Sequence, residues 1–269
     1  MMETRQSVDT SDLASSLVEE AEADARRPEG NLPVDSKYLE ALAEFAAGAG
    51  HEINNPLATI NGRVQLLLQD ETDPERRQAL MTIAGQVYRI RDMIGDVMLF
   101  GRPPEPEAET LNLAEIVETV VGKFFQEAEL RGCSFDVVQD SASVPVWADH
   151  SQLCVVISEL IRNSLNALEE SGGSIRLSVE SVLDGKQRVA LLTVSDEGVG
   201  LSEQETLHLF DPFYSGRQSG RGLGFGLPKI WRIVSNHGGR IEVESIPQGK
   251  TTFRVYWPAG TDDGGATAV

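Results

Sequence analysis

The chain has 269 residues, 41% of them hydrophobic, which is enough for one large domain or two modest ones with buried cores. Its formal net charge of −19 disfavours nucleic acids and anionic membranes as partners, because like charges repel. The two cysteines lack CxxC spacing, which argues against a disulfide framework or a zinc site. No run approaches the roughly 20 apolar residues of a membrane span, and the N-terminus lacks a signal-peptide pattern. We therefore expect a soluble, cytoplasmic protein.

The first segment, residues 1–36, is rich in Asp, Glu, Ser and Ala and contains two prolines. Such a composition buries too little apolar surface to offset the entropy lost on ordering. We expect a disordered acidic segment, with at most a marginal helix over residues 11–27.

Apolar residues then recur in steps of three and four, from Leu42 to Leu67 and again from Leu80 to Val97. The pattern breaks at residues 70–74 and ends at 101–104, so it predicts an antiparallel helical hairpin over residues 37–102. A lone hairpin leaves its apolar seam open, whereas a two-fold homodimer hides it in a four-helix bundle. The alternative is packing of the hairpin against the rest of the chain.

After a Pro-rich linker at residues 103–110, mixed helix and strand patterns predict a second domain at residues 111–260 and a tail at 261–269. Asn112 and Glu115 form a capping-box pattern that heads a helix to about residue 130, and Asp149 caps a helix through 168. Another helix is predicted over 226–236, and strands over 134–139, 175–182, 189–195, 240–245 and 251–257. Helices on one face of a mixed sheet make an α/β sandwich, and the whole chain is of the α+β class.

One histidine stands out on the hairpin. At about 100° per residue, His51 lies roughly 200° from both Ala49 and Ile53, so it points away from the apolar seam. An imidazole is a competent nucleophile, and the neighbouring Glu52 could take the ring proton. The alternative is an ordinary solvated histidine.

Two further residues accompany that histidine. Asn55 lies one turn along the same helix face, and Pro56 removes a backbone hydrogen bond, which should kink or loosen the turn. Because position 55 is Asn, the string is HExxN and lacks the second ligand of an HExxH zinc site.

Four stretches, GHEINNP (50–56), ELIRNSLNA (159–167), DEGVG (196–200) and GLGFGL (222–227), resemble in order the H, N, G1 and G2 boxes of two-component sensor histidine kinases. Residues 209–213 resemble the F box, and 215–221 a lid. The resemblance implies that Mg·ATP binds the second domain, that its γ-phosphoryl group passes to His51, and that a response-regulator aspartate accepts it. It further implies a phosphatase role for Asn55. Sensory input must come from elsewhere, and a separate sensory protein is a candidate source.

The nucleotide residues follow from chemistry and from that resemblance together. Asp196 suits the exocyclic amine of adenine, while Gly198 and Gly200 allow close backbone approach. A glycine-rich run meets a helix N-terminus, where free N–H groups suit phosphate. That run and its basic neighbours give the remaining candidates: Arg217, Arg221, Gly222, Gly224, Gly226, Leu227 and Lys229. For each basic residue, the alternative interpretation is an ordinary solvated charge on the surface.

The N-box-like stretch is expected to hold the metal. The resemblance places Mg²⁺ at Asn163, with Glu159 as a second candidate ligand and Asn166 beside the nucleotide. Glu159 stands where Asn is frequent in histidine kinases, and Asn166 where a basic residue is frequent. Both residues make the stretch more similar to that of the gyrase-, Hsp90- and MutL-like (GHKL) ATPases, in which that Glu activates water. A GHKL-type ATPase and a nucleotide-binding dimeric scaffold without kinase activity are therefore the alternative functions.

Overall fold

A computed structural model of the chain describes residues 36–139, 141, 143–168, 172–214 and 224–261. The acidic segment up to residue 35, with its predicted helix at residues 11–27, lies outside the described residues. The same holds for residues 215–223 of the lid and glycine-rich run, and for the tail beyond residue 261.

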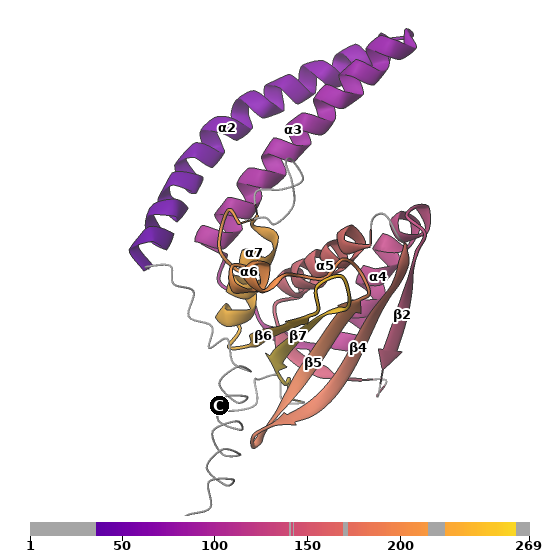
Figure 1. The fold of residues 1–269 in the computed structure, drawn as a ribbon. Coiled ribbons are helices and arrows are strands. Elements are labelled where there is room, and N and C mark those ends of the chain that lie inside the picture. Colours follow the sequence, from indigo (N-terminus) through magenta and orange to yellow (C-terminus); the bar gives the residue numbers. More distant parts are fainter. Residues whose placement is uncertain (1–35, 140, 142, 169–171, 215–223, 262–269) are drawn as a thin grey trace, which may run out of the picture. The chain divides into compact units, whose positions relative to one another are not determined.

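The predicted hairpin is present as α2 (Ser36–Asp70) and α3 (Pro74–Gly101), which run side by side in Figure 1. The break between them is set by Asp73, whose carboxylate accepts hydrogen bonds from the backbone N–H groups of Glu75 and Arg76 at 2.9 and 3.1 Å. The helix α2 continues through Pro56. The expected loosening of the His51 turn therefore does not interrupt the helix.

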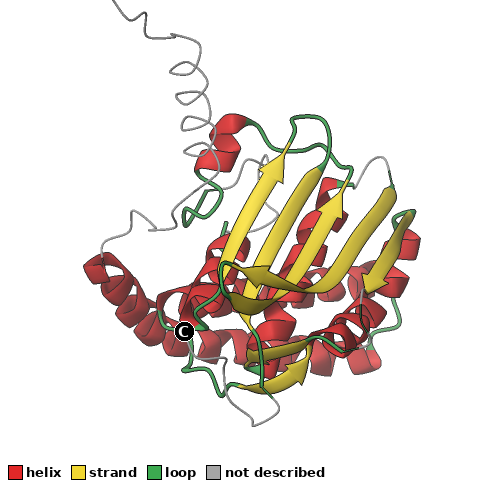
Figure 2. Ribbon diagram, turned by 90° about the horizontal axis from the view of Figure 1, so that it is seen from below, coloured by secondary structure: helices red, strands yellow, loops and turns green. Residues whose placement is uncertain are grey.

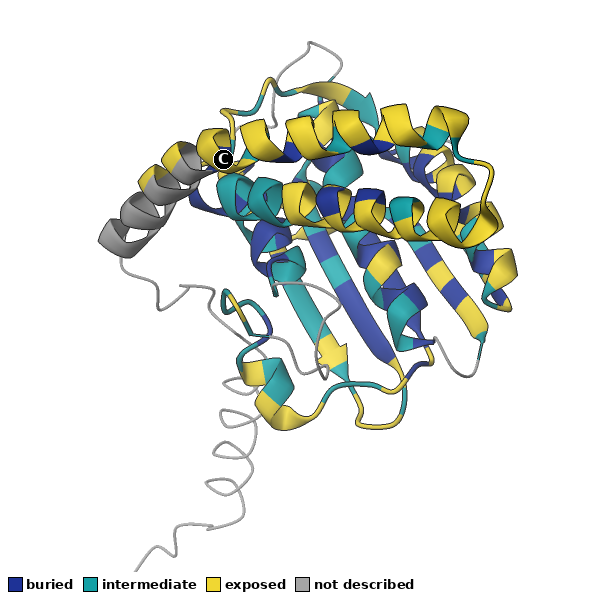
Figure 3. Cartoon of the chain, turned by 90° about the horizontal axis from the view of Figure 1, so that it is seen from above, coloured by how far each residue is buried: buried dark blue, intermediate teal, exposed yellow. Residues whose placement is uncertain are grey.

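The apolar seam divides into two rows. Leu57 and Val64 of α2 and Ala84 and Val87 of α3 are buried within the hairpin. The other row remains exposed, by 39 to 60% of each side chain, and Figure 3 shows the hairpin largely in the exposed colour. We call this row the open stripe; it consists of Ile53, Ile60, Leu67, Ile83 and Ile90.

The second domain is built on a five-stranded mixed sheet. Its strand order is β2-β4-β5-β7-β6, with β2 and β4 parallel and the other pairs antiparallel. The strands are β2 (Cys133–Gln139), β4 (Gly173–Asp184), β5 (Gln187–Asp196), β6 (Arg240–Ser245) and β7 (Thr251–Pro258). All the predicted strands are therefore confirmed, within one or two residues at most ends.

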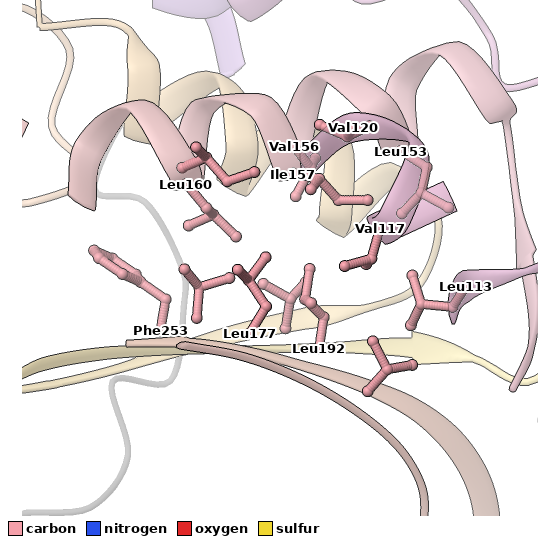
Figure 4. Packing of buried hydrophobic residues seen from close by; sticks show 14 of the residues in the cluster. Leu113, Val117, Val120, Leu153, Val156, Ile157, Leu160, Leu177, Leu192 and Phe253 are labelled. Carbon is pink, nitrogen blue, oxygen red and sulfur yellow. The ribbon is translucent and has the colours of Figure 1, made fainter. Parts of the chain in front are cut away.

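Three helices cover one face of that sheet, as Figure 2 shows: α4 (Leu113–Leu130), α5 (His150–Ala167) and α7 (Gly226–Asn236). Both predicted N-cap residues are confirmed, since Asn112 accepts from the N–H of Ala114 at 3.2 Å and Asp149 from that of Gln152 at 2.9 Å. The pairing of Asn112 with Glu115 differs from the predicted capping box, because the Asn112 side-chain amide donates a 2.8 Å hydrogen bond to the Glu115 carboxylate. Apolar side chains of α4 and α5 meet those of the sheet in the core drawn in Figure 4. The predicted α/β sandwich is thus correct.

The sequence patterns missed three short elements. β1 (Glu109–Asn112) and β3 (Pro145–Ala148) pair with each other, so β1 begins inside the predicted linker. α6 (Glu203–Leu207) starts at a reciprocal capping box between Ser202 and Glu205. None of the helices in the described ranges is both long and apolar enough to cross a bilayer.

Candidate nucleotide site and phosphoacceptor face

The candidate phosphoacceptor face lies on α2. His51, Glu52 and Asn55 are all exposed, and the four-residue spacing places His51 and Asn55 on one side of the helix. A hydrogen bond of 3.1 Å from the Thr59 hydroxyl to the Asn55 carbonyl stays within the helix. The side chains of His51 and Asn55 are therefore both accessible to a second reactant.

A glycine next to His51 brings the two helices of the hairpin together, a feature that the sequence reasoning missed. A Cβ atom on Gly50 would lie 2.9 Å from Sδ of Met98 and 3.3 Å from Cγ2 of Ile94. The backbone of α2 therefore contacts α3 directly at the residue that precedes His51.

Asp196, the candidate adenine ligand, is buried at the end of β5 with 3% of its surface exposed. Its Oδ2 accepts a 2.7 Å hydrogen bond from the Ser164 hydroxyl, and its Oδ1 accepts one of 3.1 Å from the N–H of Gly198. Two donors thus fix the carboxylate. Ser164 lies inside the N-box-like stretch and was not predicted.

The glycines after Asp196 face protein backbone. A Cβ on Gly198 would lie 2.6 Å from the carbonyl oxygen of Ala167, and one on Gly200 would lie 2.0 Å from that of Ile246. Gly200 also has a φ of +64°. Contact between protein segments is by itself enough to exclude a side chain at either position, a reason for these glycines that the sequence did not predict.

The N-terminus of α7 is the candidate phosphate site. Its N-cap residue, Phe225, supplies no side-chain hydrogen bond, so the first N–H groups and the helix dipole remain suited to an anion. Gly224, with a φ of +73°, turns the chain into the helix, where Gly226 and Leu227 form the first turn. Arg217, Arg221 and Gly222 lie outside the described residues.

The candidate metal and nucleotide residues of α5 have polar neighbours. Oε1 of Glu159 accepts a 3.0 Å hydrogen bond from Arg162, and Oδ1 of Asn166 accepts one of 3.2 Å from Arg131. Asn163 is half-buried and lies between Glu159 and Asn166 in sequence. Arg131 follows α4 and was not predicted. Its guanidinium places a positive charge beside Asn166, the position at which a basic residue was expected from the resemblance.

Lys229 is not placed as expected. The sequence reasoning assigned its ammonium to nucleotide phosphates, but the residue is only 4% exposed. Its Nζ lies 2.5 Å from Oδ1 of Asp96 on α3 and 3.3 Å from Oε1 of Glu159. Because two carboxylates already neutralise this ammonium, it is not a free phosphate-binding cation in this structure.

Within the described residues, no three His, Cys, Asp or Glu side chains gather as a metal site of their own. A magnesium ion shared with nucleotide phosphates needs fewer protein ligands.

The sequence matches two protein-domain families. Residues 41–106 match the His Kinase A (phospho-acceptor) domain, and residues 148–261 match the histidine kinase-, DNA gyrase B-, and HSP90-like ATPase family. The chain is 28% identical over 247 residues to the signal transduction histidine-protein kinase AtoS of Escherichia coli (strain K12), an alignment that covers 92% of this chain and 40% of AtoS. The chain thus spans less than half of that relative.

Solved structures of similar fold include ShkA and the histidine kinase ThkA. Full-length ShkA in complex with AMPPNP aligns with a TM-score of 0.71 at 20% identity, over 84% of this chain and 47% of ShkA. ThkA in complex with the response regulator protein TrrA aligns with a TM-score of 0.59 at 23% identity, over 83% of this chain and 63% of ThkA. The fold agrees with the family matches, and the chain therefore carries the phosphoacceptor and ATPase domains of the sensor histidine kinases, of which it is a homologue.

Proposed function

We propose that the chain is an ATP-dependent protein histidine kinase that acts in a two-component system. The single observation that carries the proposal is the exposed His51, in a phosphoacceptor domain, on the same chain as an ATPase domain with a fixed, buried Asp196. His51 would accept a phosphoryl group, and the ATPase domain would bind ATP, the phosphoryl donor.

For the nucleotide, Asp196 would accept a hydrogen bond from the exocyclic amine of adenine. The first turn of α7, at Gly226 and Leu227, would meet the phosphates with its N–H groups. Asn163 would offer its amide oxygen to Mg²⁺, which would bridge phosphate oxygens and neutralise their charge. Glu159 is the weaker candidate ligand, since Arg162 and Lys229 already lie against its carboxylate.

For the chemistry, a ring nitrogen of His51 would attack the γ-phosphorus as the bond to the ADP oxygen breaks. Glu52 would accept the proton that leaves the imidazole ring. The phosphoryl group would then pass to an aspartate of a response-regulator receiver domain, for which the exposed face of His51 and Asn55 leaves room.

The open stripe supports a homodimer. Exposed large apolar side chains that recur on one side of a hairpin mark an association surface, and a second hairpin of the same kind would bury them. We propose a two-fold dimer with a four-helix bundle, in the cytoplasm, where response regulators would be accessible.

A GHKL-type ATPase with Glu159 as the base is less well supported. A general base needs a free carboxylate near the attacking water, whereas this carboxylate has two cationic neighbours at 3.0 and 3.3 Å. A nucleotide-binding scaffold without kinase activity is the other rival.

Incubation with ATP labelled on the γ-phosphate tests the proposal. We expect label that stays on the protein in alkali and is lost in acid, and that is absent from His51→Gln although this variant still binds ATP. Release of phosphate without labelled protein would favour the ATPase, and binding without either would favour the scaffold. Label that persists in His51→Gln would refute the assignment of the acceptor.

A further inference from the structure

The side chain of Arg131 joins the end of α4 to the outer side of α5. Its Nη1 donates a 3.2 Å hydrogen bond to Oδ1 of Asn166, and its Nη2 donates one of 2.6 Å to Oε1 of Glu127. A planar guanidinium that is held at both ends has little freedom to turn. Arg131 is therefore a fixed donor, with 31% of its side chain exposed.

This contact sets the orientation of the Asn166 amide. A guanidinium can only donate hydrogen bonds, so the oxygen of the amide, and not its nitrogen, has to face Arg131. The oxygen and the nitrogen of a carboxamide lie on different sides of the same carbon atom. The NH₂ group of Asn166 is therefore turned away from α4, and its two N–H donors point to the other flank of α5.

That other flank is the one on which α7 lies. α4 packs against β2 and α7 against β6, at opposite edges of the five-stranded sheet, and α5 lies between the two helices in Figure 1. Glu159, Asn163 and Asn166 are separated by four and three residues, so they form one row along α5. The row begins beside the first turn of α7, since a Cβ on Gly226 would lie 3.0 Å from Oε2 of Glu159.

The depth of the site indicates which part of a nucleotide would meet the end of this row. Asp196, the proposed adenine ligand, has only 3% of its surface exposed, so a base bound to it lies deep in the domain. The terminal phosphates are the part of ATP furthest from the base. Asn166 is only half-buried, and N–H donors suit the oxygens of those phosphates.

We propose that Arg131 is a positioning residue for ATP, which holds Asn166 with its N–H donors towards the β- and γ-phosphates. This inference rests on the proposed nucleotide site. Because Arg131 sets the rotamer of the Asn166 side chain before ATP arrives, binding does not have to immobilise that side chain. Arg131 itself would not touch the phosphates, since both ends of its guanidinium already have partners.

The test is titration calorimetry of the full chain with a non-hydrolysable ATP analogue and, separately, with AMP, which lacks the β- and γ-phosphates. Arg131→Met keeps most of the length of the side chain and removes all of its donors. Asn166→Ala and the double variant complete a double-mutant cycle. Arg176→Met is the matched control, because Arg176 also pairs with a carboxylate, that of Asp136 at 2.7 Å, but lies on strand β4.

We expect Arg131→Met and Asn166→Ala each to bind the ATP analogue about three- to tenfold more weakly, with unchanged affinity for AMP. The double variant should be no weaker than Asn166→Ala alone, because Arg131 acts only through Asn166. Asn166→Asp, which keeps a partner for Arg131 but presents an oxygen to the phosphates, should lose at least as much affinity as Asn166→Ala. Arg176→Met should bind both ligands normally.

Four results would overturn the inference. They are normal binding of the ATP analogue by Arg131→Met or by Asn166→Asp, a further loss in the double variant, an equal loss of AMP affinity, and a comparable effect in Arg176→Met. A wild-type chain that binds neither ligand would refute the nucleotide site and this inference together. A wild-type chain that binds the ATP analogue but transfers no phosphate would refute the kinase proposal only, because every measurement in the cycle is of binding.

Discussion

The hydroxyl of Ser164 donates a 2.7 Å hydrogen bond to Oδ2 of Asp196, and it thereby ties α5 to the end of β5 at the centre of the candidate nucleotide site. Both residues are buried. A carboxylate held this way needs no reorientation to meet an adenine amine, and a ligand binds more tightly to a group that is already in place.

Ser164→Ala should weaken binding of a non-hydrolysable ATP analogue by about three- to tenfold, because the carboxylate loses a charge-assisted hydrogen bond. Titration calorimetry measures this directly. Ser151→Ala, at the exposed start of α5, is the control and should bind normally. Equal affinities in both variants would show that Ser164 does not position Asp196 for the ligand.

Ile60→Glu should abolish the dimer, because it places a charge in the middle of the open stripe. Each dimer would lose two buried isoleucine side chains, which together contribute on the order of 3 to 6 kcal/mol to the free energy of association. Sedimentation of the full chain at micromolar concentration is the measurement, and the control is Gln65→Glu, exposed on α2 outside the stripe. A wild-type monomer, or an intact dimer of Ile60→Glu, would contradict this prediction.

Gly50→Val should destabilise the hairpin by about 1 to 3 kcal/mol, because the added side chain meets Met98 and Ile94. Gly48→Val is the matched control: it changes helix propensity in the same way, but a Cβ there meets nothing within 4 Å. Urea unfolding followed by the helical signal gives the difference. Similar losses in both variants would indicate that propensity, and not packing, decides the effect.

Stability should fall as the pH drops below about 6.5, the ordinary pKa of a histidine. Burial lowers the pKa of His237, whose Nδ1–H donates to the Ile233 carbonyl at 2.8 Å and whose Nε2 accepts from the N–H of Asp149 at 3.0 Å. Because the folded pKa lies below the unfolded one, the unfolded chain binds more protons in that window. The stability that neutral His237 contributes is complete above about pH 6.5 and is lost progressively as the pH falls towards the folded pKa.

Thermal unfolding across a pH series measures that loss. His237→Gln should flatten the profile between about pH 7 and 5, while His150→Gln, at an exposed position on α5, should keep it. An unaltered profile in His237→Gln would place the pH dependence elsewhere.

Asn55→Ala should spare autophosphorylation and slow dephosphorylation of the response regulator, because a polar group one turn from His51 would hold the attacking water. Both reactions are followed with the same labelled regulator. Thr59→Ala, one turn further along, serves as the control. Equal loss of both activities in Asn55→Ala would mean that Asn55 supports the helix, and unchanged phosphatase activity would mean that it does neither job.

The long, periodic elements were predictable from sequence, because a buried face repeats its signal over many residues. The hairpin, α5 with its Asp149 cap, and the β4–β5 pair show this. β1 and β3 were not, since each is four residues long and its partner lies far away in sequence. Nothing local distinguishes Glu109–Asn112 from a loop.

The motifs identify candidate site residues, but they do not show which other side chains those residues contact. His51 and Asp196 follow from their motifs. Lys229 does not, because its partner Asp96 belongs to another domain, 133 positions away. The glycine at position 200 is likewise explained only by the carbonyl of Ile246, which the fold brings within 2.0 Å of the missing Cβ.

One residue, Asp149, connects three segments at the start of α5. Asp149 caps α5 through Gln152, accepts the N–H of Glu107, and through its own N–H is bonded to His237 at the end of α7. Because the carbonyl of Pro104 also accepts a 3.0 Å hydrogen bond from the Gln152 side chain, residues from Pro104 onwards are attached to the ATPase domain. For the engineering of chimaeric proteins, a foreign hairpin is best joined at residues 101–103. A junction there would keep the hydrogen bonds between the linker and the start of α5. A junction at Glu107 would remove part of them.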